Sequence, residues 1–299
     1  MNVIIKKIRH IIHVFLVDHY PHLVVNRMWP KFFGTKIDWN NPKDLNEKIQ
    51  WLMCFSDTSE WTRLADKYRV REYIQEKGLE NLLPKLYGKW ERAEDIDYGS
   101  LPEKFVLKCN HDCGSVHIID KTTGYNKVEI NKDLNKHVKE RFGYASCEPH
   151  YTKIKPCIIA EEFLEEKNNS FSRTLVDYKV WCFDGKPYRI CTYHNREKKH
   201  VYISCYDLNW QAHPEYLIFS DHFRDGQNMV PRPKCFKEML EAASTLSKGF
   251  PELRVDFYEV DGKLYFGELT FSCSAGKMDN FTEEFLIDMG KQIKLPINN

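Results

Sequence analysis

The stretch "RVDFYEVDGKLYFGELTF", residues 254–271, decides the fold. It predicts two β-strands joined at "VDG", because Asp-Gly between alternating apolar residues is a strong hairpin signal. We expect a three-residue loop, Val260-Asp261-Gly262, with Gly262 in the left-handed conformation. In that register Glu259 pairs with Lys263, Asp256 faces Phe266 and Glu268 faces Arg254.

This register separates an apolar face from a charged one, because strand side chains alternate between faces. A two-residue loop without a bulge would instead place Asp256 and Glu268 on opposite faces. The predicted core face holds Val255, Phe257, Leu269 and Phe271, and the predicted charged face holds Arg254, Asp256, Glu268 and Thr270.

Two carboxylates roughly 5–8 Å apart between β-carbons repel each other unless a cation lies between them. Mg²⁺ prefers one or two carboxylates together with phosphate oxygens, and Arg254 could hold a phosphate of the same ligand. A surface ladder in which Arg254 pairs with Glu268 explains the same residues. Both interpretations stay open at this point.

The rest of the chain mixes helices with hairpins. Helical spacing predicts helices over 42–55, over 61–77 ending at Gly78, over 130–143, over 236–250 and over 282–293. Alternation predicts strands at 104–110, 116–120 and 155–164, and a hairpin over 177–195 with "DG" at its corner. Helices first and hairpins later favour an α+β fold over a doubly wound parallel sheet.

Composition limits the class of protein. The 299 residues contain 44 Lys and Arg against 43 Asp and Glu, so no overall charge attracts nucleic acid. The ten cysteines form no CxxC pair. Cys109 and Cys113 around His111 could form a metal site, but reduced, partly buried thiols of a cytoplasmic protein explain them better.

The N-terminus, "MNVIIKKIRHIIHVFLVDHY", mixes basic and apolar residues. Its apolar run, Ile11 to Val17, is too short to span a bilayer, and a signal peptide would need a longer run and a cleavage site. A helix packed on its own protein is the first interpretation. A basic amphipathic helix resting on a membrane surface is the second.

Three further segments carry charged residues where strands end. Lys108 precedes the small-residue turn "HDCGS", whose backbone N–H groups could wrap phosphates. The strand in "IIAEEFLEE" runs into acids that could edge an adenine and ribose pocket, and "DYKVWCFDGK" carries Asp177 and Lys179 between apolar residues. Taken alone, each segment is also explained by an exposed, solvated surface.

The order of these segments is more specific than any one of them. "NPKDLNEKIQWL", "ADKYRVREY", "LPEKFVLKCNHDCGS" and "RVDFYEVDGKLYFGELTF" together resemble the TupA-like branch of the ATP-grasp superfamily, over roughly residues 40–280. The resemblance implies the ATP-grasp fold, in which two α+β subdomains grip ATP. It implies a helical extension over 1–62, a phosphate-binding part over 63–160 and a part with hinge and Mg²⁺ hairpin over 161–299.

The family resemblance also implies an activity, an ATP-dependent carboxylate–amine ligase with ATP and Mg²⁺ as cofactors. Such enzymes form an acyl-phosphate that an amine displaces, and this branch is found with bacterial surface-polysaccharide and capsule genes. The implied catalytic cations are Arg254 and Lys108. The implied ATP-binding residues are Lys67, Lys108, His111, Gly114, Ser115, Glu161, Glu162, Phe163, Leu164 and Lys179, and the implied metal ligands are Asp256, Glu268 and Thr270.

One departure concerns the second metal arm. Many superfamily members have Glu-x-Asn there, whereas this chain has Glu268-Leu269-Thr270, whose hydroxyl is a weaker ligand than an amide oxygen. For the substrate we expect a small-molecule or polysaccharide-linked carboxylate, such as a uronic acid, and an amine. The basic run "YRICTYHNREKKH" offers Arg189, His194 and Arg196 for the carboxylate, although a solvated loop explains it equally well.

Other functions stay open on the sequence. A kinase or glycosyltransferase of the same polysaccharides, or a non-catalytic nucleotide-binding module, would also use lysines, acids and a hinge. No HRD or DFG motif and no Asp-x-Asp supports the first two. We expect a cytoplasmic protein, either free or peripheral at the inner membrane face through residues 1–20, with no nucleic-acid partner.

Overall fold

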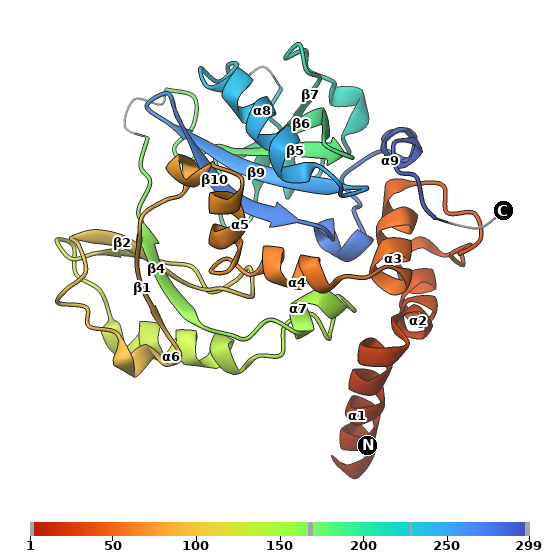
Figure 1. The fold of residues 1–299 in the computed structure, drawn as a ribbon, viewed down its shortest axis with the longest axis horizontal. Coiled ribbons are helices and arrows are strands. Elements are labelled where there is room, and N and C mark those ends of the chain that lie inside the picture. The colour runs from red at the N-terminus through yellow and green to blue at the C-terminus, as the bar shows by residue number, and fades with distance from the viewer. Residues whose placement is uncertain (1–2, 167–169, 228, 297–299) are drawn as a thin grey trace.

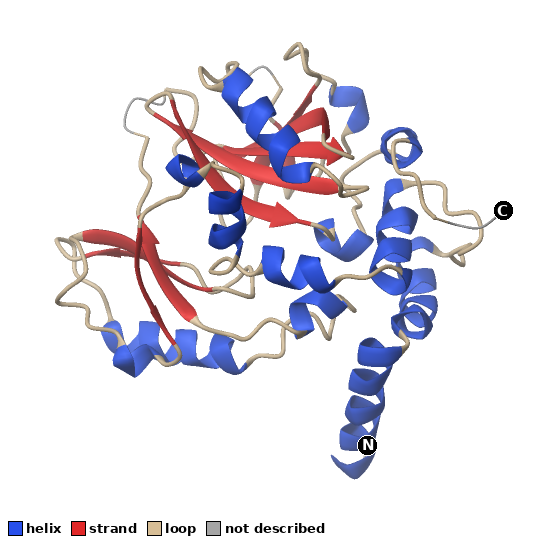
Figure 2. Cartoon of the chain, viewed as in Figure 1, coloured by secondary structure: helices blue, strands red, loops and turns tan. Residues whose placement is uncertain are grey.

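The chain folds around two antiparallel-rich sheets in a computed structural model that describes residues 3–166, 170–227 and 229–296 (Figures 1 and 2). Strands and helices alternate irregularly along the chain, so the predicted α+β class is confirmed. The helices are α1 (Val3–His19), α2 (Pro21–Phe33), α3 (Leu45–Phe55), α4 (Ser59–Ala65), α5 (Val70–Glu76), α6 (Lys127–Lys139), α7 (Pro149–Thr152), α8 (Phe236–Ser247) and α9 (Glu283–Lys291).

The smaller sheet has four strands in the order β1-β4-β2-β3. Its neighbouring strands are all antiparallel, and α6 packs on one face around Phe105, Leu107 and Leu134. The opposite face looks toward α5 and the larger sheet (Figure 1). The strands are β1 (Leu86–Trp90), β2 (Lys104–Cys109), β3 (His117–Asp120) and β4 (Ile158–Glu162).

The larger sheet has six strands in the order β10-β9-β5-β6-β7-β8. Val180, Val255 and Ile190 belong to the same core as Met239 and Ala243 of α8, which covers one face of the sheet (Figure 1). The strands are β5 (Asp177–Phe183), β6 (Lys186–His194), β7 (Val201–Tyr206), β8 (Phe223–Asp225), β9 (Leu253–Val260) and β10 (Lys263–Thr270).

Most predicted elements are confirmed. The helix expected over 42–55 is α3, which begins after Asp44 with a capping box to Glu47. The hairpin over 177–195 is β5–β6, and its corner residues Asp184 and Gly185 both have positive φ, as a two-residue type I′ turn requires. The helices expected over 130–143, 236–250 and 282–293 appear as α6, α8 and α9, and the predicted strands appear as β2, β3 and β4.

The single helix predicted over 61–77 is wrong, because the chain breaks between α4 and α5. Asp66 leaves the helical region, and its carboxylate accepts the backbone N–H groups of Tyr68 and Arg69 at 2.8 and 3.2 Å. The same oxygen accepts the Asn110 side-chain amide at 2.8 Å. Short polar side chains that bond nearby backbone N–H groups compete with the helix in this way. Lys67 therefore lies in a turn, beside the loop after β2.

Candidate active site

The β9–β10 hairpin turns through two residues, so the predicted three-residue loop is wrong. Lys263 pairs with Val260, which leaves Asp261 and Gly262 as the turn, with φ of 51° and 81°. Two positive φ values identify a type I′ turn, whose twist matches that of the flanking strands. The left-handed conformation predicted for Gly262 is confirmed.

A bulge at Gly267 restores the alignment that the shorter turn would have lost. Phe266 pairs with Phe257, and the next pair is Glu268 with Asp256, so Gly267 is the extra residue on its strand. A side chain at Gly267 would approach the Asp256 carbonyl oxygen to 3.0 Å and the Tyr258 ring to 3.1 Å. The bulge therefore depends on close backbone contact.

The predicted pairings of Asp256 with Phe266 and of Glu268 with Arg254 are wrong. Asp256 lies directly opposite Glu268, and Arg254 lies directly opposite Thr270, because the extra residue sits in the strand instead of in the turn. The predicted face is confirmed nevertheless. Arg254, Asp256, Glu268 and Thr270 contact one another on it, and Val255, Phe257 and Leu269 belong to the core with α8.

Arg254 organises this face. Its Nε and Nη2 donate to the two Asp256 oxygens at 2.7 and 2.8 Å, and its Nη2 also lies 3.0 Å from the Thr270 hydroxyl and 3.4 Å from Glu268 Oε1. Its Nη1 donates to the Cys273 sulfur at 2.7 Å. Arg254 thus bridges both carboxylates of the hairpin.

Lys179 of β5 contributes a second cation. It pairs with Asp256 across the sheet and donates a short hydrogen bond to the Asp256 carboxylate. Burial raises the pKa of Asp256, but the positive charges of Arg254 and Lys179 outweigh burial and hold that pKa below its usual value. Asp256 is therefore an anion at neutral pH although it is almost completely buried.

The donor set on this face fits Mg²⁺ in complex with a polyphosphate. Asp256 and Glu268 offer carboxylate oxygens from opposing strands, and Thr270 offers a hydroxyl. Across residues 3–166, 170–227 and 229–296, no group of three or more His, Cys, Asp or Glu forms a complete metal site. Mg²⁺ does not need one, because it keeps waters and takes phosphate oxygens beside one or two carboxylates.

Lys108 and Glu161 meet on the face of the smaller sheet that looks toward α5. The Lys108 ammonium lies 2.5 Å from Glu161 Oε2, and Arg71 of α5 lies 3.3 Å from Glu161 Oε1. Two residues expected at the ATP site are therefore paired with each other. Glu162 points to the opposite face of β4, since it pairs with Phe105, and its carboxylate accepts the backbone N–H of Lys85 at 3.1 Å.

Two more residues of the expected adenine edge follow β4. Phe163 and Leu164 are half-buried, and the Lys104 ammonium lies 5.9 Å from the centre of the Phe163 ring. They begin the connection from the smaller sheet to the larger one.

The loop after β2 receives Lys67. The Lys67 ammonium donates to the Asp112 carbonyl oxygen at 2.5 Å, and its backbone N–H donates to the Asn110 carbonyl oxygen at 3.0 Å. Asn110 also bonds Asp66, Lys155 and Cys157. Because these bonds fix both sides of the turn, Lys67 is held close to the loop that the sequence linked to phosphate binding.

Ser115 and His111 shape the loop from inside. The Ser115 hydroxyl donates to Asp112 Oδ1 at 2.5 Å and accepts the backbone N–H of Cys109 at 2.8 Å, so it closes the turn. His111 is buried beside the backbone of His137 and Glu140. Burial lowers the pKa of His111, so the ring is neutral at pH 7. Gly114 is exposed at the tip.

The negative charge of Glu268 on the hairpin acts on the loop after β2. Burial raises the pKa of the Cys113 thiol in the loop, and the charges of Asp112, Glu268 and Glu148 add to this effect although the Lys67 charge opposes it. Burial also raises the pKa of Tyr151 in α7, and Glu148 and Glu268 add to that effect. Tyr151 and Glu148 were not predicted as site residues, because the contacts that bring α7 to the hairpin are long-range.

Glu148 is tied to the end of β10. Its carboxylate accepts the Ser272 hydroxyl at 2.6 Å and the Ser146 hydroxyl at 2.5 Å. The Ser272 hydroxyl also lies 3.2 Å from His150 Nε2. These buried bonds connect the segment before β4 to the hairpin.

The three residues expected to hold a carboxylate substrate are dispersed. Arg189 shares the face of Lys179, and its guanidinium lies 4.0 Å from Asp288 and 4.3 Å from the centre of the Tyr188 ring. Arg196 is exposed and pairs with Asp177 at 2.8 Å. His194 alternates with Tyr193, whose ring lies under the Lys179 ammonium, so His194 points to the α8 side, where it is completely buried.

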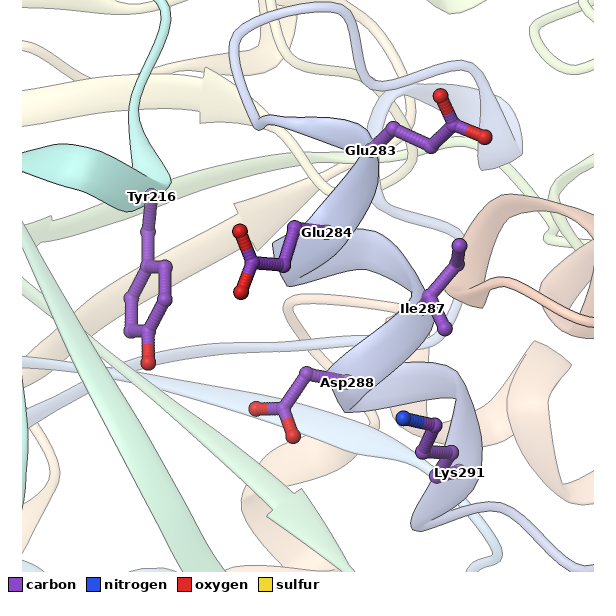
Figure 3. Close-up of a pocket in the computed structure, with 6 residues that line it drawn as sticks. All are labelled: Tyr216, Glu283, Glu284, Ile287, Asp288 and Lys291. Atoms are coloured by element: carbon purple, nitrogen blue, oxygen red, sulfur yellow. The ribbon is translucent and has the colours of Figure 1, made fainter.

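A separate hollow of about 470 Å³ opens beside α9 (Figure 3). Tyr216, Glu284 and Asp288 face it, and Glu283, Ile287 and Lys291 complete its lining. Its carboxylates would repel the phosphates of a nucleotide, and none of its lining residues belongs to the Asp256 face. It is therefore not the candidate site, although Arg189 borders it through Asp288.

Comparison with known proteins identifies the family of this chain. Solved structures similar to this chain include a D-alanine–D-alanine ligase from Bacillus anthracis, with 14% identity over 84% of this chain and 70% of that one and a TM-score of 0.44. An L-amino acid ligase from Bacillus licheniformis has 13% identity over 84% of this chain and 55% of that one, with a TM-score of 0.47. Among curated proteins no match was found. The model of the TupA-like ATPgrasp family matches residues 47–294, and the chain therefore belongs to this family and has the ATP-grasp fold.

Proposed function

We propose that this protein is an ATP-dependent carboxylate–amine ligase that forms an amide through an acyl-phosphate. One observation carries the proposal. Asp256 and Glu268 face each other beside Arg254 and Lys179, and α4, the helix that leads into Lys67, packs at the end of the same hairpin, where the Trp61 ring stacks on Phe271. This combination of paired acids and several cations suits the phosphates of Mg-ATP. Membership of an ATP-grasp family supports the same nucleotide.

The proposed ATP site lies between the two sheets. Lys67 and Lys108 would hold phosphates, and the backbone of Gly114 and its neighbours would wrap them. Glu161, Phe163 and Leu164 would border adenine and ribose, and His111 would pack beneath the loop. Each of these lysines is already paired, Lys67 with a carbonyl oxygen and Lys108 with Glu161. The phosphates of ATP would therefore displace these partners from the lysines.

Asp256, Glu268 and Thr270 would hold Mg²⁺, which when bound neutralises charge on the transferring phosphoryl group. Arg254 would then shift its guanidinium toward the same phosphate, since it spans both carboxylates. Lys179 would keep Asp256 ionised and in place. The buried environment strengthens each of these interactions, because water screens them poorly there.

In the proposed reaction a substrate carboxylate oxygen attacks the γ-phosphorus of ATP, and the bond to the β-phosphate oxygen breaks to release ADP. The amine then attacks the acyl carbon, loses a proton and expels phosphate, which carries away one oxygen of the original carboxylate. Charge neutralisation is the main requirement of the first step. The loop at residues 110–115 would shield the acyl-phosphate from water.

For the carboxylate we propose an acidic sugar, free or linked to a polysaccharide, and for the amine a small amino compound. Arg189 supports this choice because it lies on the Lys179 face and presents a guanidinium suited to carboxylates. Arg196 would assist from the surface, and we leave His194 out because it is buried on the other side of the sheet. Arg189→Ala should raise KM for the carboxylate and leave KM for ATP unchanged.

We also propose the division into residues 1–62, 63–160 and 161–299 as extension, phosphate-binding part and metal-binding part, and a cytoplasmic location. The first proposed boundary lies within α4 and the second within β4. Apart from the last two residues of β4, each sheet falls within one part and would contribute one wall of the ATP site.

Product analysis with panels of uronic acids and amines tests the function. A ligase releases ADP and phosphate in equal amounts, and only when both carboxylate and amine are supplied. A phosphorylated acceptor as the final product would show a kinase instead. ATP binding without turnover under any pair of substrates would favour a non-catalytic module.

A further inference from the structure

Helix α1 exposes an apolar stripe on the side turned away from its own protein. Its packed side holds Val17, which is fully buried, and His13, which lies 2.7 Å from the Tyr144 carbonyl oxygen. The other side shows large apolar side chains that are 45–66% exposed: Ile4, Ile5, Ile8, Ile11, Ile12 and Phe15. At 3.6 residues per turn these six positions fall on one side of the helix.

The stripe is unusual for its size and its position. Single exposed apolar residues are normal, but a contiguous exposed stripe marks an interaction surface. Figure 1 shows α1 projecting from the body, away from both sheets, with the N-terminal end outermost. The proposed ATP site therefore does not explain the stripe.

The charge of the helix points to an anionic partner. Lys6, Lys7 and Arg9 lie within its first turns, and the first acid of the chain is Asp18, near the end of α1. Lys7 and Arg9 flank the apolar stripe on its two sides. Long basic side chains beside an apolar stripe allow a helix to lie in a lipid interface, with the stripe in the acyl boundary and the ammonium groups among phosphates.

We propose that α1 docks this protein on a membrane surface that contains anionic lipids. The helix would lie in the plane of the membrane and would not cross it. Among the described residues no helix combines the length and apolar character that a membrane span requires. Docking through the stripe would keep the contacts that Val17 and His13, on the packed side of α1, make with the rest of the protein. An enzyme held in this way could work on a substrate attached to lipid.

Sedimentation with vesicles tests the proposal on the full chain. Vesicles of phosphatidylcholine alone are compared with vesicles that also contain phosphatidylglycerol, at low and high salt. We expect binding only to the anionic vesicles and a steep loss of binding as salt rises, because salt screens the lysines. Equal binding to both kinds of vesicle, or to neither, would overturn the proposal.

Two matched pairs of variants locate the surface. Lys7→Gln with Arg9→Gln, which removes the two basic residues that flank the stripe, should weaken partitioning by about 30-fold, since each basic residue contributes about a fivefold factor. Lys198→Gln with Lys199→Gln, an exposed lysine pair between β6 and β7, should not. Ile8→Ser with Phe15→Ser should weaken it by about tenfold or more, whereas Val128→Ser, 79% exposed on α6, should not. Equal losses in test and control variants would contradict the proposal.

The competing occupant is a second copy of the chain. Sedimentation velocity without lipid distinguishes it. A dimer that Ile8→Ser with Phe15→Ser dissociates, together with no vesicle binding by the wild type, would assign the stripe to self-association and overturn membrane docking.

Discussion

Two charge-removing substitutions on the hairpin face should have the same effect on turnover and different effects on stability. Asp256→Asn and Glu268→Gln each remove one negative charge and keep the shape of the side chain. Their surroundings differ: the Asp256 side chain is 3% exposed and contacts both Lys179 and Arg254, whereas the Glu268 side chain is 40% exposed and lies 3.4 Å from Arg254. The pair therefore separates a metal-binding role from a structural one.

The magnitudes follow from these surroundings. Glu268→Gln breaks a partly exposed ion pair, which is expected to cost less than about 1 kcal/mol of unfolding free energy. Asp256→Asn leaves two buried cations without their main partner, which is expected to cost about 3–5 kcal/mol. Loss of a Mg²⁺ ligand weakens charge neutralisation at the transferring phosphoryl group and should lower kcat by about 10²–10³ in both variants, equivalent to about 3–4 kcal/mol.

Urea unfolding without ligands and ADP release with saturating Mg-ATP and substrates measure the two effects. Glu241→Gln serves as the control, because it removes an exposed, paired carboxylate from α8. A folded Glu268→Gln variant with wild-type turnover would refute the metal assignment. Equal stability of Asp256→Asn and Glu268→Gln would refute the electrostatic account of the hairpin.

Three further predictions follow from the same geometry. Lys108→Met should weaken ATP binding by about 10- to 100-fold in calorimetry, the range of a charge-assisted hydrogen bond, while Lys237→Met on the exposed side of α8 should not. Equal affinities of the two variants would exclude Lys108 from the site. Gly267→Ala should reduce turnover by a larger fraction than it reduces the urea midpoint of unfolding, because its β-carbon would push on the Asp256 carbonyl oxygen 3.0 Å away. An unchanged rate would show that the bulge tolerates a side chain. Burial lowers the pKa of His194 to about 4. The unfolded chain therefore binds more protons below pH 6.5, and about 3 kcal/mol of stability should be lost as the pH falls from 6.5 to 4. His194→Leu should flatten this dependence of stability on pH, and an unchanged slope would contradict the prediction.

The charged face of the hairpin was predictable, but the register that creates it was not. The apolar alternation of Val255, Phe257 and Leu269 requires a buried face. The alternation therefore fixes which residues lie on the other face of the hairpin. Where the one extra residue sits is a finer question. The chain uses a two-residue turn and a bulge at Gly267, whereas the sequence pattern suggested a three-residue turn and no bulge. A glycine inside a strand is itself a bulge signal, so Gly267 was the available clue.

The break at Lys67 has a similar explanation. Periodic apolar residues run through 61–77, so the pattern alone favours one helix. Asp66 overrides the pattern because its carboxylate bonds two backbone N–H groups and Asn110, and Asn110 lies 44 residues away along the chain. The bonds of Asp66 to nearby backbone N–H groups could be anticipated from the sequence, since aspartate prefers caps to helix interiors. The bond to the distant Asn110 could not.

The pairing of charges within the site also lay beyond the sequence. Lys108 meets Glu161, and Lys179 meets Asp256, only because antiparallel neighbours bring them to one face. The sequence singled out each residue but gave no partner. His194 shows the converse, since a basic run predicted a substrate contact and strand alternation turned the ring to the other side of the sheet.

The most direct test of the ligase proposal follows one oxygen atom. A carboxylate substrate labelled with ¹⁸O at both oxygens is incubated with the enzyme, Mg-ATP and the amine, and the released phosphate is analysed by mass spectrometry. Attack of the carboxylate on ATP predicts one ¹⁸O atom in each phosphate formed. Unlabelled phosphate alongside amide formation would contradict the acyl-phosphate mechanism on which the proposed roles of Arg254, Asp256 and Glu268 depend.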